Sequence, residues 1–347
     1  WTDGRFRGTA SAADGGGDGG DDDGAPRKLR ELLLLDAPTD AVAAAAAATA
    51  GAIGRGIVLA RQLVGGPPNA VTPAVLAGVA ATVAEMGDGW RLVVKDAAGA
   101  AGAGMGAFGA GGGAVALVGK GVTYDSGGYN LKVGAASMIH LMKFDMGGAA
   151  AVLGAARALA ETRPPVEVHV VIAACENLIS DTAMRPGNII KASNGVTIEV
   201  GNTDAEGRLT LADALAYASG LPGVTHVVEL STLTGAVIVA LGKSIGGLMT
   251  PHDDLAASLQ SAAVAAGEPL WRLPLYAPYV SSLDSALADV NNIGAKGGVG
   301  AGTITAGLFL AKFVRAGVAW AHIDIAGAAY DHGGDGGGTG YGVATLV

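Results

Sequence analysis

The feature that most constrains the fold is the regular alternation of short apolar runs with alanine-rich helical patterns along most of the chain. The apolar runs predict strands at 114–118, 166–174, 224–231 and 319–326. The helical patterns predict helices at 73–86, 145–161, 208–219, 253–266 and 303–316. Such alternation is typical of α/β proteins in which helices cover both faces of a parallel sheet. The sequence therefore predicts a three-layer α/β/α sandwich with a central, largely parallel mixed sheet.

The first part of the chain, residues 1–50, differs in composition from the main domain expected at 51–347. An acidic glycine run at 14–25 has no helical or strand pattern and indicates a solvated loop or linker. A strand is expected at 30–35, and a long helix at 39–64 joins this part to the main domain. Because the chain starts with tryptophan rather than methionine, we expect a processed or incomplete N-terminus in which no targeting signal is visible.

Composition argues against several classes of protein. The formal net charge of −9 argues against a nucleic-acid groove, because phosphate binding needs a basic face. The longest apolar run, at 41–52, is mostly alanine and too short to cross a bilayer, so we expect no membrane partner. Cys175 is the single cysteine of the sequence, which excludes intrachain disulfides and suits a reducing compartment.

A first group of charged residues follows the apolar run at 115–118, in the sequence VGKGVTYDSGGYNLK. Lys120 is expected at the carboxyl end of this strand, where open α/β sheets build their sites. Asp125, with two glycines behind it, is expected on a tight loop, and Lys132 follows in the same run. Asp145 opens an alanine-rich helical pattern and is a candidate helix N-cap.

A second group lies in NTDAEGRL, residues 202–209, just ahead of another helical pattern. Asp204, Glu206 and Arg208 occupy alternating positions, which would place the three side chains on one side of an extended segment. Two carboxylates and a guanidinium crowded at the start of a helix contribute nothing to a core. They fit cation ligands with an anion-binding arginine beside them.

The four carboxylates of the two groups cannot all ionise at close range without counter-charge. Two divalent cations would supply it, and oxygen donors with one amine suit zinc, manganese, magnesium or cobalt. A lysine that ligates a metal must be neutral, so the metal has to depress its pKa. Two metals that share carboxylates activate one bridging water and polarise a carbonyl oxygen.

Each of these residues also has an ordinary explanation. Asp145 can be a helix cap, Asp125 a turn residue, and Asp204 and Glu206 partners of a helix dipole. A lone lysine is usually a solvated surface charge. Together these explanations are weak, because seven charged groups gather in three short segments of a chain with only 15% charged residues.

Other kinds of site lack their signatures. The GxGxxG pattern of Gly104, Gly106 and Gly109 has no leading strand and no acidic residue at the required distance, so dinucleotide binding is not expected. Gly121 follows Lys120 where a phosphate loop has serine or threonine, and the sequence contains no HExxH or GxSxG motif. The histidines that lie inside apolar strand patterns, and are therefore expected in the core, are His169, His226 and His322.

Taken together, these motifs resemble the leucyl aminopeptidase family, also called cytosol aminopeptidases, whose members are dinuclear-metal exopeptidases. NTDAEGRL matches intact, and VGKGVTYDSGG and DMGGAA match in order and spacing. The resemblance extends through LARQLVGGPPNAVTP, STLTGA, GEPLWRLPL, ITAGLFLAKFV and WAHIDIAG, and covers roughly residues 50–347. The YDSGGYNLKVGAASMI block is most similar to plant-type and bacterial members.

The resemblance implies two metal positions. The residues that would hold the tightly bound metal are Lys120, Asp125, Asp145 and Glu206. The residues that would hold the exchangeable metal are Asp125, Asp204 and Glu206. Zinc or manganese is expected, with magnesium or cobalt as alternatives.

The resemblance also implies roles for residues beside the metals. Lys132 would bind the scissile carbonyl oxygen, and Arg208 would hold a bicarbonate ion that acts as general base. The free α-amine of the substrate would meet Asp145. The residues implied to line the side-chain pocket are Met142, Thr232 and Gly235.

The implied activity is that of a metal-dependent aminopeptidase that removes leucine and other apolar residues from the N-terminus of peptide substrates. The implied assembly is a homohexamer, a dimer of trimers, in the cytoplasm or the chloroplast stroma. The alternative is a catalytically silent relative kept as a structural oligomeric scaffold. A DNA-binding role is discouraged by the net charge of −9.

The chain departs from the family pattern in three respects. Residues 1–50 would be only the last part of an N-terminal α/β domain, a remnant with an acidic loop and a linker helix ahead of a catalytic dimetal domain at 51–347. The block that precedes the VGKG strand is shorter than usual, so the 109–114 segment marks either a deletion or missing residues. Asn188 stands where the family has an acid, and His140 where relatives are acidic or neutral.

Overall fold

The computed structural model describes residues 40–347, apart from 88, 96–112, 135–136, 295–299 and 332–335. The chain divides into two compact units, 1–51 and 52–347, and the boundary falls inside helix α1 (Asp40–Gly65). α1 confirms the helix expected at 39–64. The expected strand at 30–35, the acidic glycine run, the GxGxxG pattern and most of the shortened 109–114 segment lie outside the described residues. The assignment of residues 1–50 to a truncated domain stays a prediction.

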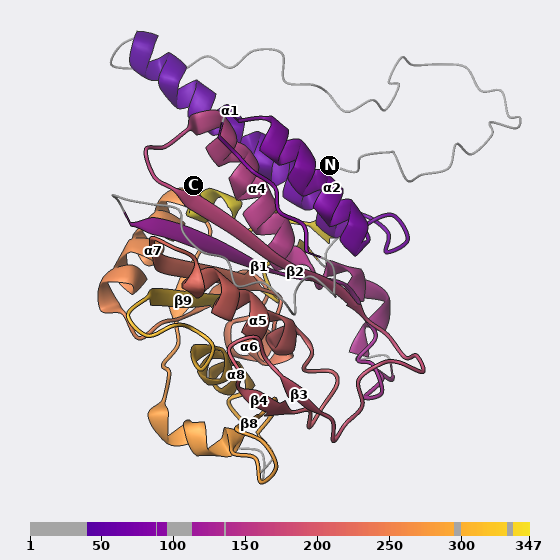
Figure 1. Cartoon of the computed structure of the whole chain (residues 1–347). Coiled ribbons are helices and arrows are strands. Elements are labelled where there is room, and N and C mark those ends of the chain that lie inside the picture. Colours follow the sequence, from indigo (N-terminus) through magenta and orange to yellow (C-terminus); the bar gives the residue numbers. More distant parts are fainter. Residues whose placement is uncertain (1–39, 88, 96–112, 135–136, 295–299, 332–335) are drawn as a thin grey trace, which may run out of the picture. The chain divides into compact units, whose positions relative to one another are not determined.

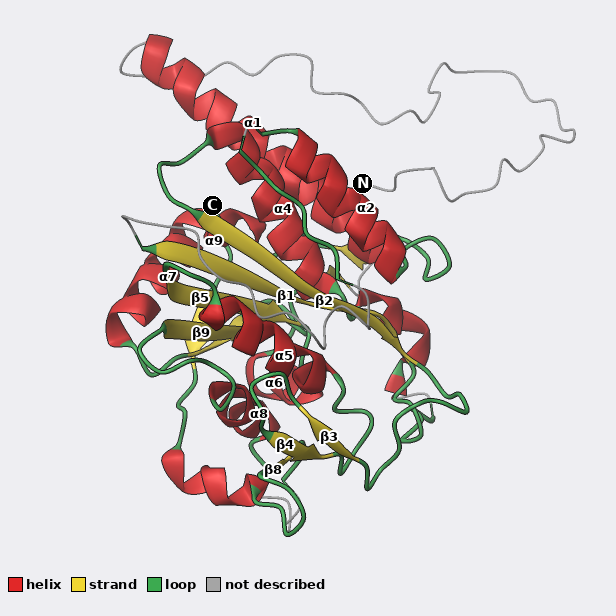
Figure 2. Ribbon diagram, in the orientation of Figure 1, coloured by secondary structure: helices red, strands yellow, loops and turns green. Residues whose placement is uncertain are grey.

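A six-stranded sheet forms the centre of the second unit (Figure 2). In spatial order its strands are β2 (Val168–Asn177), β1 (Ala114–Asp125), β5 (Val224–Ser231), β9 (Ala319–Asp324), β6 (Gly246–Met249) and β7 (Leu270–Arg272). The first four strands are parallel to one another, and β6 is antiparallel to β9 but parallel to β7. The prediction of a largely parallel mixed sheet is therefore confirmed.

Helices cover both faces of this sheet (Figures 1 and 2). One layer contains α1 from residue 52 onward, α2 (Pro73–Glu85), α4 (Gly147–Thr162), α7 (Asp253–Ala266) and α9 (Val343–Leu346). The opposite layer contains α5 (Gly207–Gly220), α6 (Gly235–Leu241), α8 (Gly302–Ala311), the 3-10 helix η4 (Ala277–Leu283) and a small sheet of β3 (Ile189–Lys191), β4 (Thr197–Glu199) and β8 (Val290–Asn291). A short hairpin of β10 (Tyr330–Asp331) and β11 (Gly337–Gly338) lies near the C-terminus of the chain.

Strand β1 shows why a continuous apolar run produces a central strand. Ala116 and Val118 belong to the core cluster on the α5 side, whereas Leu117 belongs to the cluster on the α4 side. All three side chains are buried, because successive residues of a strand point to opposite faces and both faces are covered by helices. This layering fixes β1 between α4 and α5. The predicted site residues Asp145 and Glu206 lie just ahead of these two helices.

Several expectations about individual elements were wrong. β1 continues to Asp125 instead of ending at 118, so Lys120 lies inside the strand and Asp125 is its last residue rather than a loop residue. The helix expected at 303–316 ends at Ala311. Strands of two to four residues, such as β3, β4, β6, β7 and β8, were not predicted, because so short a run has no readable period.

The expectation that no apolar run is long enough for a membrane was also wrong. The apolar stretch continues past the alanine run, and residues Ala41–Gly65 are long and apolar enough to cross a bilayer by length and composition alone. A single such helix is weak evidence, because core helices and N-terminal signal sequences meet the same criterion. From residue 52 onward, Ala60, Leu63 and Val64 of this helix belong to the hydrophobic core.

A buried ion pair links two neighbouring strands of the sheet. Glu229 of β5 lies opposite His322 of β9, both side chains are fully buried, and the Glu229 carboxylate is hydrogen-bonded to Nδ1 of His322. Burial disfavours the imidazolium, but the carboxylates of Glu229 and Asp324 outweigh burial and the opposing charge of Arg208. The pKa of His322 is therefore raised above its ordinary value.

We expect the α4–sheet contact to tolerate no added methyl group. A Cβ on Gly148 would lie 2.0 Å from the Leu230 carbonyl oxygen, whereas a Cβ on the helical Gly78 would meet no atom within 4 Å. Gly148→Ala should therefore lower the free energy of unfolding by about 1–3 kcal/mol through overpacking. The control Gly78→Ala should raise it by up to about 1 kcal/mol, because alanine favours the helix. Urea denaturation measures both changes, and a Gly148→Ala protein as stable as wild type would contradict the close contact.

We also expect stability to fall with rising pH through the Glu229–His322 pair. A raised folded-state pKa means that the folded protein holds a proton the unfolded chain loses near pH ~6.5, so this contribution is present below that pH and is lost as pH rises through the folded-state pKa. Urea unfolding at several pH values from about 6 to about 9 measures the slope. Glu229→Gln removes the attracting charge and should flatten it. An unchanged slope in this variant would contradict the coupling.

Candidate active site

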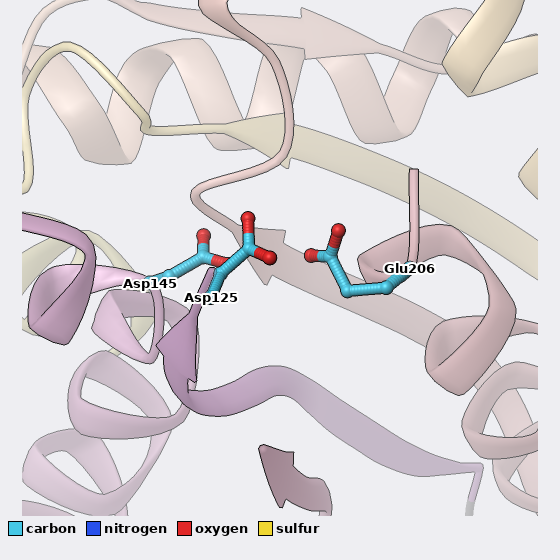
Figure 3. A group of neighbouring side chains, drawn as sticks. All are labelled: Asp125, Asp145 and Glu206. Atoms are coloured by element: carbon cyan, nitrogen blue, oxygen red, sulfur yellow. The ribbon is translucent and has the colours of Figure 1, made fainter. Parts of the chain in front are cut away.

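Three buried carboxylates from distant parts of the sequence converge at one end of the sheet. Asp125 ends β1, Asp145 directly follows the 3-10 helix η3 (Ile139–Phe144), and Glu206 directly precedes α5. One oxygen from each lies within 4.8 Å of the others, and no residue of the three is more than 4% exposed. Figure 3 shows the carboxylates of Asp125 and Glu206 facing each other, with Asp145 beside Asp125.

Lys120 ties two of these carboxylates together. Its Nζ lies 2.7 Å from Asp145 and 3.0 Å from Glu206, and it donates a hydrogen bond to the Thr232 carbonyl oxygen at 3.2 Å. Burial disfavours the ammonium, but the carboxylates of Asp145, Glu206 and Asp125 outweigh burial and raise the pKa of Lys120. In this arrangement Lys120 acts as a cation, so it would have to lose a proton to ligate a metal.

A glycine gives the Lys120 side chain its space. Gly207, the first residue of α5, lies directly against this side chain. A Cβ on Gly207 would lie 2.4 Å from Cε of Lys120. The glycine of the NTDAEGRL motif is therefore explained by the close approach of helix and lysine, a role that the sequence analysis did not assign.

Lys132 connects the fourth predicted carboxylate to the cluster. Its Nζ lies 2.9 Å from Asp125 and 2.5 Å from Asp204, and its backbone N–H donates to the Ser126 carbonyl in the loop after β1. Burial opposes its charge, but Asp125 and Asp204 outweigh burial and raise the pKa of Lys132. Asp204 thus meets the cluster through this lysine and is not one of the three carboxylates that lie within reach of one another.

Arg208 is a buried cation with an open donor. The residue is only 8% exposed, and Nη1 donates to the Asn292 carbonyl at 2.9 Å. Nε has no hydrogen-bond partner among the residues that the structure describes. Burial lowers the pKa of Arg208 to about 10, against the attraction of Glu206 and Asp324. A buried guanidinium with a free N–H fits a planar oxyanion such as a carboxylate or bicarbonate.

The charge of the cluster favours further cations. Burial raises the pKa of Asp145 well above its ordinary value, and the Lys120 ammonium offsets this effect only in part. Lys120 therefore compensates only part of the negative charge of ionised Asp145, and divalent ions would supply the remaining positive charge. Converging carboxylate oxygens with one amine are a donor set that fits zinc, manganese or magnesium.

The residues predicted to line the substrate pocket differ in their contacts. Thr232 contacts it directly, because its hydroxyl donates to Asp145 Oδ1 at 2.8 Å. Gly235 is the first residue of α6, and a Cβ there would meet nothing within 4 Å, so the space above it is open. Met142 lies on η3 and belongs to the hydrophobic core, and its role in a pocket stays a prediction.

One of the ordinary explanations is wrong, and so is one geometric expectation. Asp145 is not the N-cap of α4, because that position is Met146 and the carboxylate contacts Lys120 and Thr232 instead. Glu206 occupies the N-cap position of α5, at the positive end of the helix dipole, without a capping hydrogen bond from its side chain. Residues 203–204 form a turn and Arg208 lies inside α5, so the chain is not extended here and the alternation argument failed, even though Asp204 and Glu206 reach one cluster.

Uncharged residues that the sequence analysis missed hold this cluster in place. Asn177 donates through Nδ2 to Asp125 Oδ1 and to the Thr203 carbonyl, each at 2.9 Å. The Asn292 amide oxygen accepts from the backbone of the turn at 201–202, while its carbonyl accepts from Arg208. Asn177 ends β2 beside Asp125, so the rule that strand ends carry sites could have found it, whereas no sequence signal indicates Asn292.

Other predicted features fall outside the cluster. His322 lies in the core as expected, but His226 is exposed, and the partly exposed His169 pairs with Glu167 at the surface. The two residues lie in strands as expected, but their burial was wrongly predicted, because the period of a strand does not tell which face is covered. His140 is exposed, and Asn188 accepts a hydrogen bond from the Arg185 backbone in an exposed turn, so neither departure from the family pattern touches a proposed ligand. Cys175 lies inside β2, which continues past the expected end at 174, and burial raises its pKa to about 12.

Comparison with known proteins agrees with this geometry. Residues 109–347 match the model of the cytosol aminopeptidase family, catalytic domain. A probable cytosol aminopeptidase of Prochlorococcus marinus is 53% identical over 318 residues, which is 84% of this chain and 64% of that protein. The chloroplastic leucine aminopeptidase A1 of Solanum lycopersicum is 51% identical over 317 residues, 84% of this chain and 55% of that protein.

A solved structure is similar as well. A mutant of tomato leucine aminopeptidase superimposes with a TM-score of 0.76 at 47% identity, over 86% of this chain and 61% of that one. The chain thus spans less than two thirds of the length of each of these relatives. The family match nevertheless covers more than half of this chain and includes every residue of the charged cluster. The chain belongs to the cytosol aminopeptidase family.

Proposed function

We propose that this chain carries the catalytic site of a metal-dependent aminopeptidase that removes N-terminal residues from peptides, with leucine and other apolar residues preferred. The observation that carries the proposal is the buried convergence of Asp125, Asp145 and Glu206 around two lysine ammonium groups in a member of this family. Isolated structural ion pairs do not need three carboxylates this close together. Converging carboxylate oxygens are instead the donor set that suits a divalent ion.

Two divalent ions, zinc or manganese with magnesium or cobalt as alternatives, fit this donor set. The residues that would hold them are Lys120, Asp125, Asp145, Asp204 and Glu206. When bound, such ions polarise a carbonyl oxygen and make water a nucleophile near neutral pH. The neighbouring residues Asn177 and Thr232 support the proposal, because they fix the orientation of Asp125 and Asp145 by hydrogen bonds.

Lys132 is proposed to bind the scissile carbonyl oxygen. Its side chain is 16% exposed, more open than the 2% of Lys120, and it sits at the edge of the cluster between Asp125 and Asp204. A positive charge held there by two carboxylates is preorganised for an oxygen that becomes negative during the reaction. Lys120, enclosed on all sides, has no such access to substrate.

The preference for a free N-terminus is proposed to come from Asp145. Burial and the nearby carboxylates of Glu206 and Asp125 raise the pKa of this carboxyl group against the pull of Lys120, and a substrate amine would add a further positive donor. Thr232, which donates to Asp145 Oδ1, holds the carboxylate in position for that contact. The open space at Gly235 would admit an apolar side chain, with Met142 as a further pocket residue.

Location and assembly remain proposals. The curated relatives comprise cytosol aminopeptidases and a chloroplastic enzyme, which supports the cytoplasm or the chloroplast stroma. The homohexamer implied by the resemblance stays a prediction.

We expect hydrolysis of a leucyl chromogenic amide that is lost on treatment with a chelator and restored by zinc or manganese. Lys132→Met should lower kcat roughly 10²- to 10³-fold, because it removes the charge aimed at the developing oxyanion. Glu206→Gln should lower activity and the amount of metal bound per chain. The exposed Glu176→Gln serves as a matched control and should leave both unchanged. A wild-type protein that binds metal but hydrolyses no N-terminal residue would instead support the silent scaffold.

We further expect Arg208 to hold bicarbonate, which would act as general base. Adding bicarbonate to protein prepared in carbonate-free buffer should raise kcat, since the open Nε of this buried guanidinium provides a donor for the anion. Arg208→Ala should abolish the response while the bound metal, measured by elemental analysis, stays the same. A bicarbonate response that survives in Arg208→Ala would rule out this site.

A further inference from the structure

We propose that Asp324 is a positioning residue that fixes the loop between β5 and α6, and thereby sets where Lys120 and Asp145 meet. This inference deepens the proposed function, because it concerns residues proposed to hold metal. Asp324 is the last residue of β9 and is fully buried. It is not among the three carboxylates that could share one ion, so its burial needs another explanation.

The Asp324 carboxylate gathers donors from one short loop. Its Oδ1 accepts hydrogen bonds from the backbone N–H groups of Leu233 at 3.1 Å and Thr234 at 3.4 Å. Its Oδ2 accepts a hydrogen bond from the Thr234 hydroxyl at 2.6 Å. The backbone N–H of Ala326, on the chain just after β9, also donates to Oδ1 at 3.2 Å. A buried carboxylate with several such donors holds them more strongly than a neutral acceptor would.

Thr234 extends this connection to two helices. Its hydroxyl lies 3.0 Å from the Thr303 hydroxyl at the start of α8, and it accepts a hydrogen bond from the Val237 N–H as the N-cap of α6. Both threonines are buried. The loop is therefore fixed by side-chain contacts with β9, α8 and α6 rather than by apolar packing alone.

A single peptide unit transmits this restraint to the site. The N–H of Leu233 that donates to Asp324 and the C=O of Thr232 that accepts from Lys120 belong to the same peptide. Because a peptide unit is planar and rigid, a shift at the N–H moves the carbonyl as well. The same residue, Thr232, also donates its hydroxyl to Asp145. Asp324 thus acts on both partners of the Lys120–Asp145 pair without touching either.

The test changes Thr234 rather than a residue of the charged cluster. Thr234→Val removes the hydroxyl that Asp324 accepts and keeps the shape, whereas Thr234→Ser keeps the hydroxyl. Zinc affinity is measured on the full chain by competition with a chromogenic chelator, alongside urea unfolding. Thr234→Val should weaken zinc binding roughly 10- to 100-fold, as is usual for partners of metal ligands, and Thr234→Ser should bind within about twofold of wild type.

Two further variants separate positioning from general loss of structure. Asp324→Asn should weaken zinc binding in the same direction as Thr234→Val. Asp289→Asn alters another aspartate that accepts from a backbone N–H and a threonine hydroxyl, those of Thr197, away from the charged cluster, and should leave zinc binding unchanged.

The outcomes distinguish this inference from the proposed function. Wild-type protein that binds no zinc would contradict the proposed function and this inference with it. Wild-type protein that binds zinc, together with folded Thr234→Val and Asp324→Asn variants of equal affinity, would overturn only the role of Asp324. Equal losses in Thr234→Val and Thr234→Ser would overturn it as well, because the hydroxyl would then be irrelevant.

Discussion

The structure depends on the mutual compensation of buried charges around Lys120. An ammonium and several carboxylates removed from water would each be costly alone, and the cost falls because the Lys120 ammonium faces both Asp145 and Glu206. Lys132 extends the same compensation from Asp125 to Asp204. The raised pKa of Asp145 indicates that the balance is incomplete, which is the electrostatic reason for proposing divalent ions there.

The fold produces this density of charge by a simple arrangement. β1 and β5 run parallel, so the loops that follow their carboxyl ends lie at the same edge of the sheet. The chain ahead of α4 and of α5, on opposite faces of the sheet, adds one carboxylate from each side. α4 contacts the sheet closely at Gly148, and α5 contacts Lys120 closely at Gly207. These contacts hold both helices at a fixed distance from the central strands.

Much of this could be predicted from the sequence, because the periods of apolar residues indicate where strands and helices lie and NTDAEGRL is a specific motif. The extent of β1 was missed because glycines and Lys120 interrupt its apolar run, although the strand continues through them. Asn177, Asn292 and Asp324 were missed for another reason. Each acts through contacts with residues far along the chain, and composition and local spacing carry no information about such contacts. Only Asn177 had an indirect signal, because it ends a strand beside Asp125.

The uneven exposure of the cluster has a consequence for access. The side chains of Lys120, Asp145 and Glu206 are between 2% and 6% exposed, whereas those of Lys132 and Asp204 are 16% and 32% exposed. The side of the cluster around Lys120 is buried, and the side at Lys132 and Asp204 borders the solvent. Among the described residues, an incoming small solute therefore meets the cluster first at Lys132 and the Asp204 turn.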